Sequence, residues 1–518
     1  MPLVSRVRRK TYVDSLVLMR VATNVREIPG VIDVIIMMGT PKNKAIILKN
    51  RPLTDEVESA GSEDILFLIE AETEKIANQG LDEAEQLLFS SSSVSSLQKD
   101  LVLTRFRSLQ GAISGLSDAN MALFSIPGPY VKDEALRALR RGLNVMIFSD
   151  NVPLEAEVEI KRTARDLGLL VMGPDCGTAL IHGIGLGFAN QVNRGPVGIV
   201  GASGTGIQEV ACLVDRWGSG VSHAIGTGSN DVKAEVGGIT MQNGIDLLVN
   251  DALTRVIVLI AKPPAPAVQS VLLDKIRNCP KPIIVHFQGA DMRDIQEGGA
   301  KPAATLAETA ALAVESCSGG AEFRLDTGDG ALGLARAAWR GLKKEQTLVR
   351  GVFAGGTFCG EAAGVIQKEL GRVYTNTGYP GTLPLTDQGC SMGHACIDLG
   401  DDQFTAGRPH PMLEPVVCRD RILLEAANPR AAVLLLDVVL GYGVHPDPAG
   451  VLVPVLEKAR EQAEAEGRNL AIVAHVCGTD RDPQVRSKQV EKLHRAGVLV
   501  ASTNAEAASL ACRIVQRS

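Results

Sequence analysis

A glycine-rich turn follows an apolar run near the middle of the chain. Residues 197–201 read VGIVG, and the next residues, ASGTG, bring Ser203, Gly204, Thr205 and Gly206 to the point where a strand should pass into a helix. In such a turn, backbone N–H groups converge on an anion and the helix dipole adds a favourable partial charge. The turn predicts a phosphate cradle, and a tight packing turn without a ligand is the alternative.

Two other chemistries do not match this turn. A Walker A loop needs the pattern GxxxxGK[ST], and no lysine follows the glycines here. A nucleophile elbow needs GxSxG, whereas GASGTG places Ser203 directly before a glycine. We therefore expect neither a Walker-type nucleotide loop nor a nucleophilic serine.

Three polar clusters in the last third of the chain each follow an apolar run. Because carboxyl ends of parallel strands meet at one edge of a sheet, we expect the clusters to converge there. Neighbouring carboxylates suit Mg²⁺, and an arginine suits a phosphate or a carboxylate. Solvated loops with helix N-caps are the alternative for each cluster. The clusters consist of Asp398, Asp401, Asp402, Arg408 and His410; of Asp437, His445 and Asp447; and of His475, Asp480, Arg481 and Asp482.

Five residues of these clusters are candidates for chemistry. Asp401 and Asp402 are the candidate metal ligands, and Arg408, His410 and His445 are candidate catalytic residues. His286, in the apolar run IIVHFQ, is expected to be a strand residue and not a ligand.

Repeated strand–helix units must position these residues. Beyond residue 118, near-continuous apolar runs are each followed by an amphipathic helix, which is typical of a parallel α/β sheet. Ligands collect at the carboxyl ends of such strands. Before the glycine turn, these ends hold four candidate cofactor-binding residues, Pro127, Asn151, Pro174 and Cys176.

The elements group into four predicted domains. Residues 1–95 predict a small α+β, ferredoxin-like domain for assembly, and residues 96–194 predict a Rossmann-type domain that begins with a serine-rich linker. Residues 195–320 and 345–518 predict two flavodoxin-like doubly wound domains. These two open alike, with GIVGASGTGIQE and GVFAGGTFCGE, which indicates a pseudo-symmetric pair in an α/β protein.

Composition restricts the partners. The chain has 518 residues, a net charge of −6 and a pI of about 5.9, so no basic field favours nucleic acid or a membrane surface. No apolar run reaches the roughly 18 residues of a membrane span, and the apolar stretch near the N-terminus is too short for a signal peptide. The 10 cysteines form no CxxC pair, which favours a reducing compartment. We expect a cytoplasmic protein.

Several motifs together resemble a known superfamily. The stretch from NVMIFSDNVPLEAEVEIKRTARDLGLLVMGPDCGTAL to GPVGIVGASGTGIQEV resembles the α-subunit of succinyl-CoA synthetase and other ADP-forming acyl-CoA synthetases. AAVLLLDVVLGYGVHPDPAG resembles the part of the β-subunit that carries a second phosphate-binding helix. With MMGTPKNK, IDLGDDQFTAGRPHPM and GTDRDPQ in the same chain, the sequence looks most like the FdrA family, over nearly its whole length.

The resemblance implies roles for particular residues. In the synthetases a phosphorylated histidine swings between two helix N-termini, and a glutamate contacts it. The matching positions here are Ser203, Gly204, Thr205 and Glu209 on one side, with Glu209 a candidate catalytic residue, and the segment 441–447 with Gly441 and Gly443 on the other. The Rossmann-type domain is then CoA-binding-like, and the two doubly wound domains are succinyl-CoA synthetase-like.

Two departures modify these roles. The loop expected to carry the phosphorylated histidine reads MRDIQEGGAKPAAT, residues 292–305, and holds no histidine. The region expected to hold the CoA phosphates is the serine-rich stretch FSSSSVSSLQKD, residues 89–100, which has no glycine turn. Both departures argue against a phosphohistidine relay and against ordinary CoA binding.

Three functions follow from the resemblance. The first is a subunit of a carbamoyltransferase of ureide (allantoin) catabolism, which converts oxalurate and phosphate into oxamate and carbamoyl phosphate. The second is an ADP-forming acyl-CoA synthetase that acts with a nucleotide-binding partner, and the third is a non-catalytic scaffold of such a complex. The expected ligands are phosphate and a small carboxylate or ureide, with Mg²⁺ as an optional ligand. The expected partners are other protein subunits, with self-association left open.

Overall fold

A computed structural model of the chain describes residues 2–11, 13, 15–26, 28–50, 54–89, 106, 108–318, 333, 335, 336, 338–385, 393–405 and 410–517. The chain divides into two compact units, one of Met1–Ser117 with Asp402–Pro409 and one of Asp118–Asp401 with His410–Ser518. Within the described residues, no helix is both long and apolar enough to cross a lipid bilayer. The serine-rich stretch lies outside the described residues, apart from Phe89.

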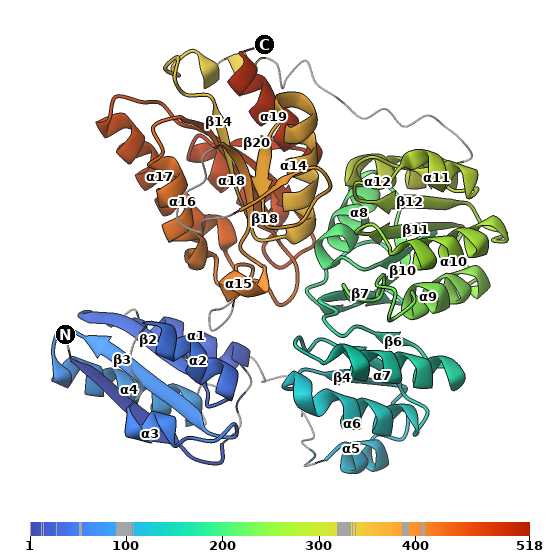
Figure 1. Ribbon diagram of the computed structural model, residues 1–518, viewed down its shortest axis with the longest axis horizontal. Helices are drawn as coiled ribbons and strands as arrows, with labels where there is room; N and C mark the ends of the chain where they lie inside the picture. The colour runs from blue at the N-terminus through green and yellow to red at the C-terminus, as the bar shows by residue number, and fades with distance from the viewer. Residues whose placement is uncertain are drawn as a thin grey trace. The chain divides into compact units, whose positions relative to one another are not determined.

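The first unit contains a small antiparallel sheet of order β1-β3-β2 (Figure 1). Its central strand is buried on both faces because alternate side chains point to opposite sides. Ile65, Phe67 and Ile69 pack with one cluster, and Leu66 and Leu68 pack with another. The elements are β1 Leu3–Arg8, α1 Ser15–Arg26, β2 Val31–Met38, α2 Pro41–Asn50, α3 Asp55–Glu58, β3 Ile65–Ala71, α4 Glu74–Phe89, α5 Leu109–Gly115 and α15 Asp402–Thr405.

The expected small α+β domain is therefore confirmed. Its sheet, as far as the described ranges extend, has 3 strands and is one strand short of the β-α-β-β-α-β ferredoxin-like pattern.

The second unit begins with a 3-stranded parallel sheet of order β4-β5-β6, which is the core of the predicted Rossmann-type domain. The predicted boundary at residue 194 does not coincide with the sheets. The hairpin that follows β6 joins the next sheet, because its first strand pairs antiparallel with β10. The elements are β4 Met121–Phe124, α6 Gly128–Leu139, β5 Asn144–Ile147, α7 Leu154–Asp166, β6 Val171–Met172, β7 Thr178–Ile181 and β8 Ile184–Gly187.

The next sheet has 7 strands in the order β13-β12-β11-β9-β10-β7-β8. Its parallel part is doubly wound around β9, and side chains of β11 alternate between the two faces. Helices α8 and α12 cover one face of this sheet, and α9 and α10 cover the other (Figure 1). Val258 and Ile260 pack with the first pair of helices, and Ile257 and Leu259 pack with the second. The elements are β9 Val197–Gly201, α8 Gly204–Arg216, β10 Val221–Gly226, α9 Ile239–Asn250, β11 Val256–Ala261, α10 Pro266–Arg277, β12 Ile283–Phe287, α11 Met292–Glu297, β13 Lys301–Pro302 and α12 Leu306–Cys317.

The last sheet also has 7 strands, in the order β16-β15-β17-β14-β18-β19-β20. It is parallel throughout and winds around β14 as the previous sheet winds around β9. The elements are β14 Leu348–Phe353, α14 Gly356–Leu370, β15 Val373–Thr375, β16 Leu383–Pro384, β17 His394–Asp398, the 3-10 helix η1 Pro415–Cys418, α16 Arg419–Ala426, β18 Ala431–Val439, α17 Pro448–Ala465, β19 Ala471–Cys477, α18 Arg486–Arg495, β20 Leu499–Ala501 and α19 Asn504–Gln516.

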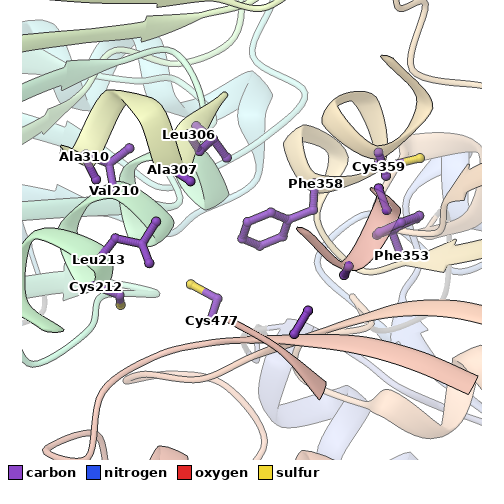
Figure 2. Close-up of a cluster of buried hydrophobic side chains, with 14 of the residues drawn as sticks. Val210, Cys212, Leu213, Leu306, Ala307, Ala310, Phe353, Phe358, Cys359 and Cys477 are labelled. Atoms are coloured by element: carbon purple, nitrogen blue, oxygen red, sulfur yellow. The ribbon is translucent and has the colours of Figure 1, made fainter. Parts of the chain in front are cut away.

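The two doubly wound domains share one hydrophobic core. Figure 2 shows side chains of α8, α12, α14 and β19 gathered in one cluster, with Phe358 pointing toward the side that holds Leu306 and Leu213. Phe358 and Leu213 are fully buried. The two domains are therefore joined by close packing, and the α/β fold class with two flavodoxin-like domains is confirmed.

Candidate functional site

Helix α8 begins at the carboxyl end of the central strand β9, as the glycine turn predicts. Ser203 is the N-cap, and its Oγ accepts a hydrogen bond from the N–H of Gly206 at 3.0 Å. A Cβ at Gly206 would lie 2.8 Å from that Oγ, so the turn needs glycine there. The N–H groups of Gly204 and Thr205 have no hydrogen-bond partner within the described part of the chain. These two donors are oriented as an anion cradle requires.

The start of α14 lies against this cradle. The hydroxyl of Ser203 hydrogen-bonds the hydroxyl of Thr357, and a Cβ on Gly355 would lie 2.8 Å from Thr205 Cγ2. Asp437, at the end of β18, holds this start in place because its carboxylate accepts the N–H groups of Ala354 and Gly355 at 2.7 and 2.8 Å. The N-termini of α8 and α14, each with a positive partial charge, therefore lie next to each other.

Asp398 borders the same place from the end of β17. Its Oδ1 accepts the N–H of Gly400 at 2.9 Å, and a Cβ on Gly356 would lie 2.5 Å from its Oδ2. Burial raises the pKa of Asp398 to about 7, and the neighbouring Asp401 and Asp437 add to the shift. Asp398 is therefore a carboxyl group able to exchange a proton near neutral pH beside a pair of helix N-termini.

His410 contributes a neutral imidazole. Its Nδ1 accepts the N–H of Met412 at 3.2 Å, which leaves the hydrogen on Nε2. That Nε2 would lie 2.7 Å from a Cβ on Gly400, so His410 reaches the loop that follows Asp398. Burial lowers the pKa of His410 to about 4, and the ring is uncharged at neutral pH. The predicted catalytic residue His410 thus lies beside the site.

Three side chains that the sequence analysis did not single out complete this edge. Gln288, just after β12, donates to the carbonyl of Thr357 at 3.0 Å, and Lys262, just after β11, donates to the carbonyl of Thr377 at 3.4 Å. Asn376 bonds the backbone of Asp398 in both directions, at 2.8 and 2.9 Å. Each of Lys262, Gln288 and Asn376 follows an apolar strand directly, which is the signal that would have found them.

The predicted metal ligands receive no support from the described geometry. Across the described ranges, no group of three or more His, Cys, Asp or Glu side chains is arranged to hold a metal ion. Asp401 lies on the loop after Asp398, the side chain of Asp402 is outside the described residues, and so is the whole of Arg408. A role for these residues remains a prediction.

The second predicted phosphate helix, α17, begins in a loop that is already packed. The N–H of Gly441 donates to Gln484 at 3.1 Å, and Gly443 lies near Phe188. Asp447 is the N-cap of α17: its carboxylate accepts the N–H of Gly450 at 3.1 Å and pairs with Lys492 at 2.5 Å. A carboxylate thus occupies the place that a phosphate would need.

His445 lies in the same loop, at the start of α17. Its Nδ1 accepts the N–H of Asp447 at 3.0 Å, and its backbone N–H donates to the carbonyl of Met412 at 2.9 Å. These contacts give His445 a role in holding the loop. The geometry offers no support for the predicted catalytic role of His445.

The third predicted cluster holds the domains together. Asp482 is buried and accepts hydrogen bonds from Asn190, from the N–H of Gln191 and from the N–H of Thr479, at 2.7 to 2.9 Å. Arg481 pairs with Asp215 on α8. Asp398 and Asp437 therefore meet at the start of α14, with His410 beside them. His445 and Asp447 lie at the start of α17 instead, and the third cluster packs against residues 190–193 and α8.

The candidate cofactor-binding residues lie around the ends of β4, β5 and β6. Pro127 is the N-cap of α6, and a Cβ on Gly128 would lie 2.3 Å from the carbonyl oxygen of Asn151. Pro174 follows a cis peptide bond, and Cys176 is buried, with its thiol pKa raised to about 12 by burial. These carbonyl oxygens lie where a side chain at position 128 would point, so the start of α6 requires glycine.

Glu209 lies buried in the interface between the two doubly wound domains. It is 1% exposed, and its Oε2 lies 2.8 Å from Nε2 of His475 in β19. Burial alone would raise the pKa of Glu209, but His475, together with Arg216 and Cys477, holds the pKa below its ordinary value. The resemblance left this glutamate without its histidine, and the fold supplies another one from the partner domain.

Three family models match parts of the chain. They are described as "AllF, heavy metal-associated domain" for residues 1–101, "CoA binding domain" for residues 192–289 and "CoA-ligase" for residues 352–514. The Escherichia coli protein YahF, which is described as uncharacterized, is 38% identical over 505 residues, covering 98% of this chain and 97% of YahF. The chain belongs to the FdrA-like family.

Other relatives of this FdrA-like chain are synthetases. The α-subunit of an ADP-forming succinate–CoA ligase from Methanothermobacter thermautotrophicus is 27% identical over 176 residues, which cover 33% of this chain and 58% of the subunit. Among solved structures, the ATP citrate lyase of Methanothrix soehngenii in complex with citrate and coenzyme A matches 43% of this chain and 42% of its own at 14% identity, with a TM-score of 0.38. The family models and the match to the succinate–CoA ligase subunit identify the FdrA-like chain as an acyl-CoA synthetase-related protein with an AllF-like N-terminal domain.

The heavy-metal description does not fit the residues of the N-terminal domain. Residues 1–101 contain no cysteine and no histidine, which are the ligands that soft metals select. The carboxylate of Asp64 is held by Arg9 at 3.0 Å and by the N–H groups of Lys10 and Gly61. This FdrA-like domain therefore has no cysteine or histidine with which to hold a heavy metal.

Proposed function

We propose that this chain is the phosphate-handling subunit of a carbamoyltransferase that converts oxalurate and inorganic phosphate into oxamate and carbamoyl phosphate. The observation that carries the proposal is the cradle at the start of α8. Its two N–H donors, Gly204 and Thr205, lie beside the start of α14 and near Asp398. A phosphate bound there has a proton-exchanging carboxyl group and a second helix N-terminus for a carboxylate substrate beside it.

The reaction needs no histidine relay. An oxygen of HPO₄²⁻ attacks the carbamoyl carbon, the bond from that carbon to the bridging nitrogen breaks, and the proton of the phosphate passes to that nitrogen to give the oxamate amide. Asp398, whose pKa is about 7, is suited to carry this proton, and Nε2 of His410 is suited to donate a hydrogen bond to the leaving group. Most of the catalysis comes from positioning and from N–H groups that stabilise developing charge.

The loss of the relay residues supports direct transfer. Residues 292–305 hold no histidine, the start of α17 is capped by Asp447, and Glu209 is buried against His475. A relay would need a mobile histidine and a second open cradle. Neither is provided by the described residues.

The second candidate is an ADP-forming acyl-CoA synthetase that works with a nucleotide-binding partner. The CoA-ligase and CoA-binding family models favour it. The serine-rich stretch of residues 89–100 argues against it, because it has no glycine turn where the resemblance expects the CoA phosphates to be held.

One assay separates the candidates. The chain is purified alone and with the products of its genomic neighbours, and the mixtures are tested for carbamoyl phosphate from oxalurate and phosphate, and for thioester from ATP, CoA and a short carboxylic acid. We expect the first product only. Thioester formation without carbamoyl phosphate would establish the second candidate. Inactivity in every mixture would favour the third function, a non-catalytic scaffold.

A matched pair of variants tests the cradle. Gly204→Asp places a carboxylate among the N–H donors and should abolish phosphate turnover. Gly204→Ala should retain most activity, because its Cβ would meet only Thr178, with Oγ1 at 3.2 Å. Equal activity of the two variants would show that the cradle takes no part in the reaction. Arg408→Ala tests the predicted arginine in the same assay.

A further inference from the structure

The Glu209–His475 contact joins two domains. Glu209 lies on α8 in the first doubly wound domain, and His475 lies on β19 in the second. Both side chains are buried, at 1% and 0% exposure, and the Oε2–Nε2 distance is 2.8 Å. Nδ1 of His475 lies 3.5 Å from the carbonyl oxygen of Ala501. With one nitrogen toward that carbonyl and the other toward a carboxylate, the imidazole is fixed in orientation.

A pseudo-symmetric counterpart lies in the other domain. Glu361 stands at the same position on α14 as Glu209 on α8, because each follows a Gly-Thr pair at the start of its helix with the same spacing. His286 on β12 corresponds to His475, and its Nδ1 faces the carbonyl of Ala303 at 3.0 Å. The symmetry of the two domains therefore provides two places for a glutamate–histidine link.

In the described residues only one of these places holds such a link. Glu361 accepts the N–H of Leu306 at 2.7 Å and the side-chain N–H of Asn504 at 2.8 Å. Nε2 of His286 is buried and makes no hydrogen bond with any described residue. Burial raises the pKa of Glu361 to about 7, so this glutamate is much less charged than Glu209. Of the two equivalent helices, only α8, which carries the cradle, has its glutamate bonded to a histidine of the other domain among the described residues.

Helix α8 is attached to the second domain along its length. At its start Ser203 hydrogen-bonds Thr357, and one turn later Gln208 donates to the carbonyl of Leu440 at 3.3 Å. At its end Arg216 donates to the carbonyl of Ser502 at 3.2 Å. Glu209 makes the buried ionic contact among these and lies less than two turns from the cradle.

We propose that Glu209 and His475 are positioning residues that hold the start of α8 against the start of α14 and so keep the anion cradle aligned with Asp398. Neither side chain touches the substrate. The inference rests on the proposed function for its biological meaning, but the alignment itself is a property of the folded chain and is measured without turnover.

A disulfide-trapping experiment measures the alignment directly. Ser203→Cys and Thr357→Cys are introduced together, the protein is oxidised with diamide, and the cross-linked peptide that joins these two positions is quantified by mass spectrometry. Glu209→Met, which removes the carboxylate at similar volume, should slow trapping about tenfold, equivalent to about 1.4 kcal/mol. Glu209→Gln retains a carbonyl acceptor for the His475 N–H and should restore most of the rate. Glu361→Gln is the matched control and should leave the rate unchanged.

Two results would overturn the proposal. One is an unchanged trapping rate in folded Glu209→Met, and the other is an equal loss in Glu361→Gln. If Glu209→Met does not fold, His475→Met breaks the same link from the other side and leaves a carboxyl group that can bind a proton. Its trapping rate then decides the question in the same way.

A double-variant cycle separates positioning from catalysis. Affinity for sulfate, used as an inert anion probe, should fall by a similar factor in Glu209→Met and in His475→Met, and no further in the double variant, because both changes break one link. A catalytic Glu209 predicts unchanged sulfate binding and near-normal turnover in His475→Met. A wild-type chain that forms no carbamoyl phosphate but shows these trapping differences would refute the proposed function and leave the positioning role in place.

Discussion

At the scale of single residues, position in the fold sets the charge of each carboxyl group. Glu209 and Glu361 occupy equivalent positions on two similar helices, yet His475 lowers the pKa of Glu209 whereas burial raises that of Glu361 to about 7. Asp398 is also shifted to about 7 by burial. Glu209 is therefore ionised at neutral pH, whereas Glu361 and Asp398 are only partly ionised, because their surroundings differ.

The raised pKa of Glu361 predicts a pH-dependent stability. A carboxyl group with a folded pKa of about 7 and an ordinary value of 4.5 stabilises the fold fully below pH 4.5 and loses that contribution as pH rises through 7. Glutamine does not ionise, so Glu361→Gln should not lose stability over this pH range. Relative to wild type, the variant should gain about 2 to 3 kcal/mol of unfolding free energy between pH 5 and pH 8.

Urea denaturation of both proteins at the two pH values provides the measurement for Glu361. The glutamine keeps an acceptor for the N–H of Leu306, and its N–H₂ group can donate to Oδ1 of Asn504 once the Asn504 amide turns over. That turn gives up the Asn504 hydrogen bond to the carbonyl of Phe358. Parallel pH profiles of wild type and variant would show that Glu361 is ionised in the fold.

Asp398 predicts a pH-dependent anion affinity. Below pH 7 its carboxyl group is neutral, and above pH 7 its charge opposes an anion at the neighbouring helix starts. Sulfate affinity should therefore fall by roughly tenfold from pH 6 to pH 8, about 1.4 kcal/mol of repulsion, and Asp398→Asn should abolish that fall. Calorimetric titration with sulfate avoids the titration of phosphate itself. Asp246→Asn, at an exposed carboxylate on α9, is the control and should retain the wild-type profile.

At the scale of elements, the starts of α8 and α17 differ in what caps them. Ser203 uses a neutral hydroxyl and leaves two N–H groups without a partner among the described residues, whereas Asp447 fills the start of α17 with a charge. Because a carboxylate competes with an anion for the same donors, α8 is the open one of the two. The two helices that the resemblance treats as equivalent phosphate sites are therefore different.

The cap of α8 can be tested against a cap of the same kind elsewhere. Ser203→Ala and Thr503→Ala each remove a hydroxyl that accepts a backbone N–H at a helix start, and each should cost about 1 kcal/mol of stability. Only Ser203→Ala should also weaken sulfate binding, since Thr503 caps α19. Thermal melting with and without sulfate measures both effects. A loss of sulfate binding in both variants would point to general destabilisation.

At the scale of the whole molecule, the shared core makes two domains behave as one. Phe358 of α14 is fully buried in a cluster that also includes Leu213 and Leu306 from the preceding domain (Figure 2). Phe358→Ala should cost about 3 to 5 kcal/mol and should destabilise both domains together. Amide exchange in α8 and in α14, followed by mass spectrometry, should rise in parallel. Faster exchange in α14 alone would show that the domains unfold independently.

The sequence by itself determined the local features of this protein. Strand runs followed by glycine turns and amphipathic helices predicted the doubly wound domains, and the turn at Ser203 predicted the open start of α8, because these depend on neighbouring residues. The strand position of His286 was also predicted from the apolar run around it and is observed in β12.

Only the tertiary structure decided which distant residues meet. The partner of Glu209 is 266 residues away at His475, and Asp482 bonds Asn190 across 292 residues. The sequence placed His445, Asp447 and Asp482 in polar clusters that follow strands, and the structure shows that these side chains bond to loops and helix starts. Packing between domains sets those contacts, and no local pattern encodes them, since each contact joins two elements that lie far apart in the sequence.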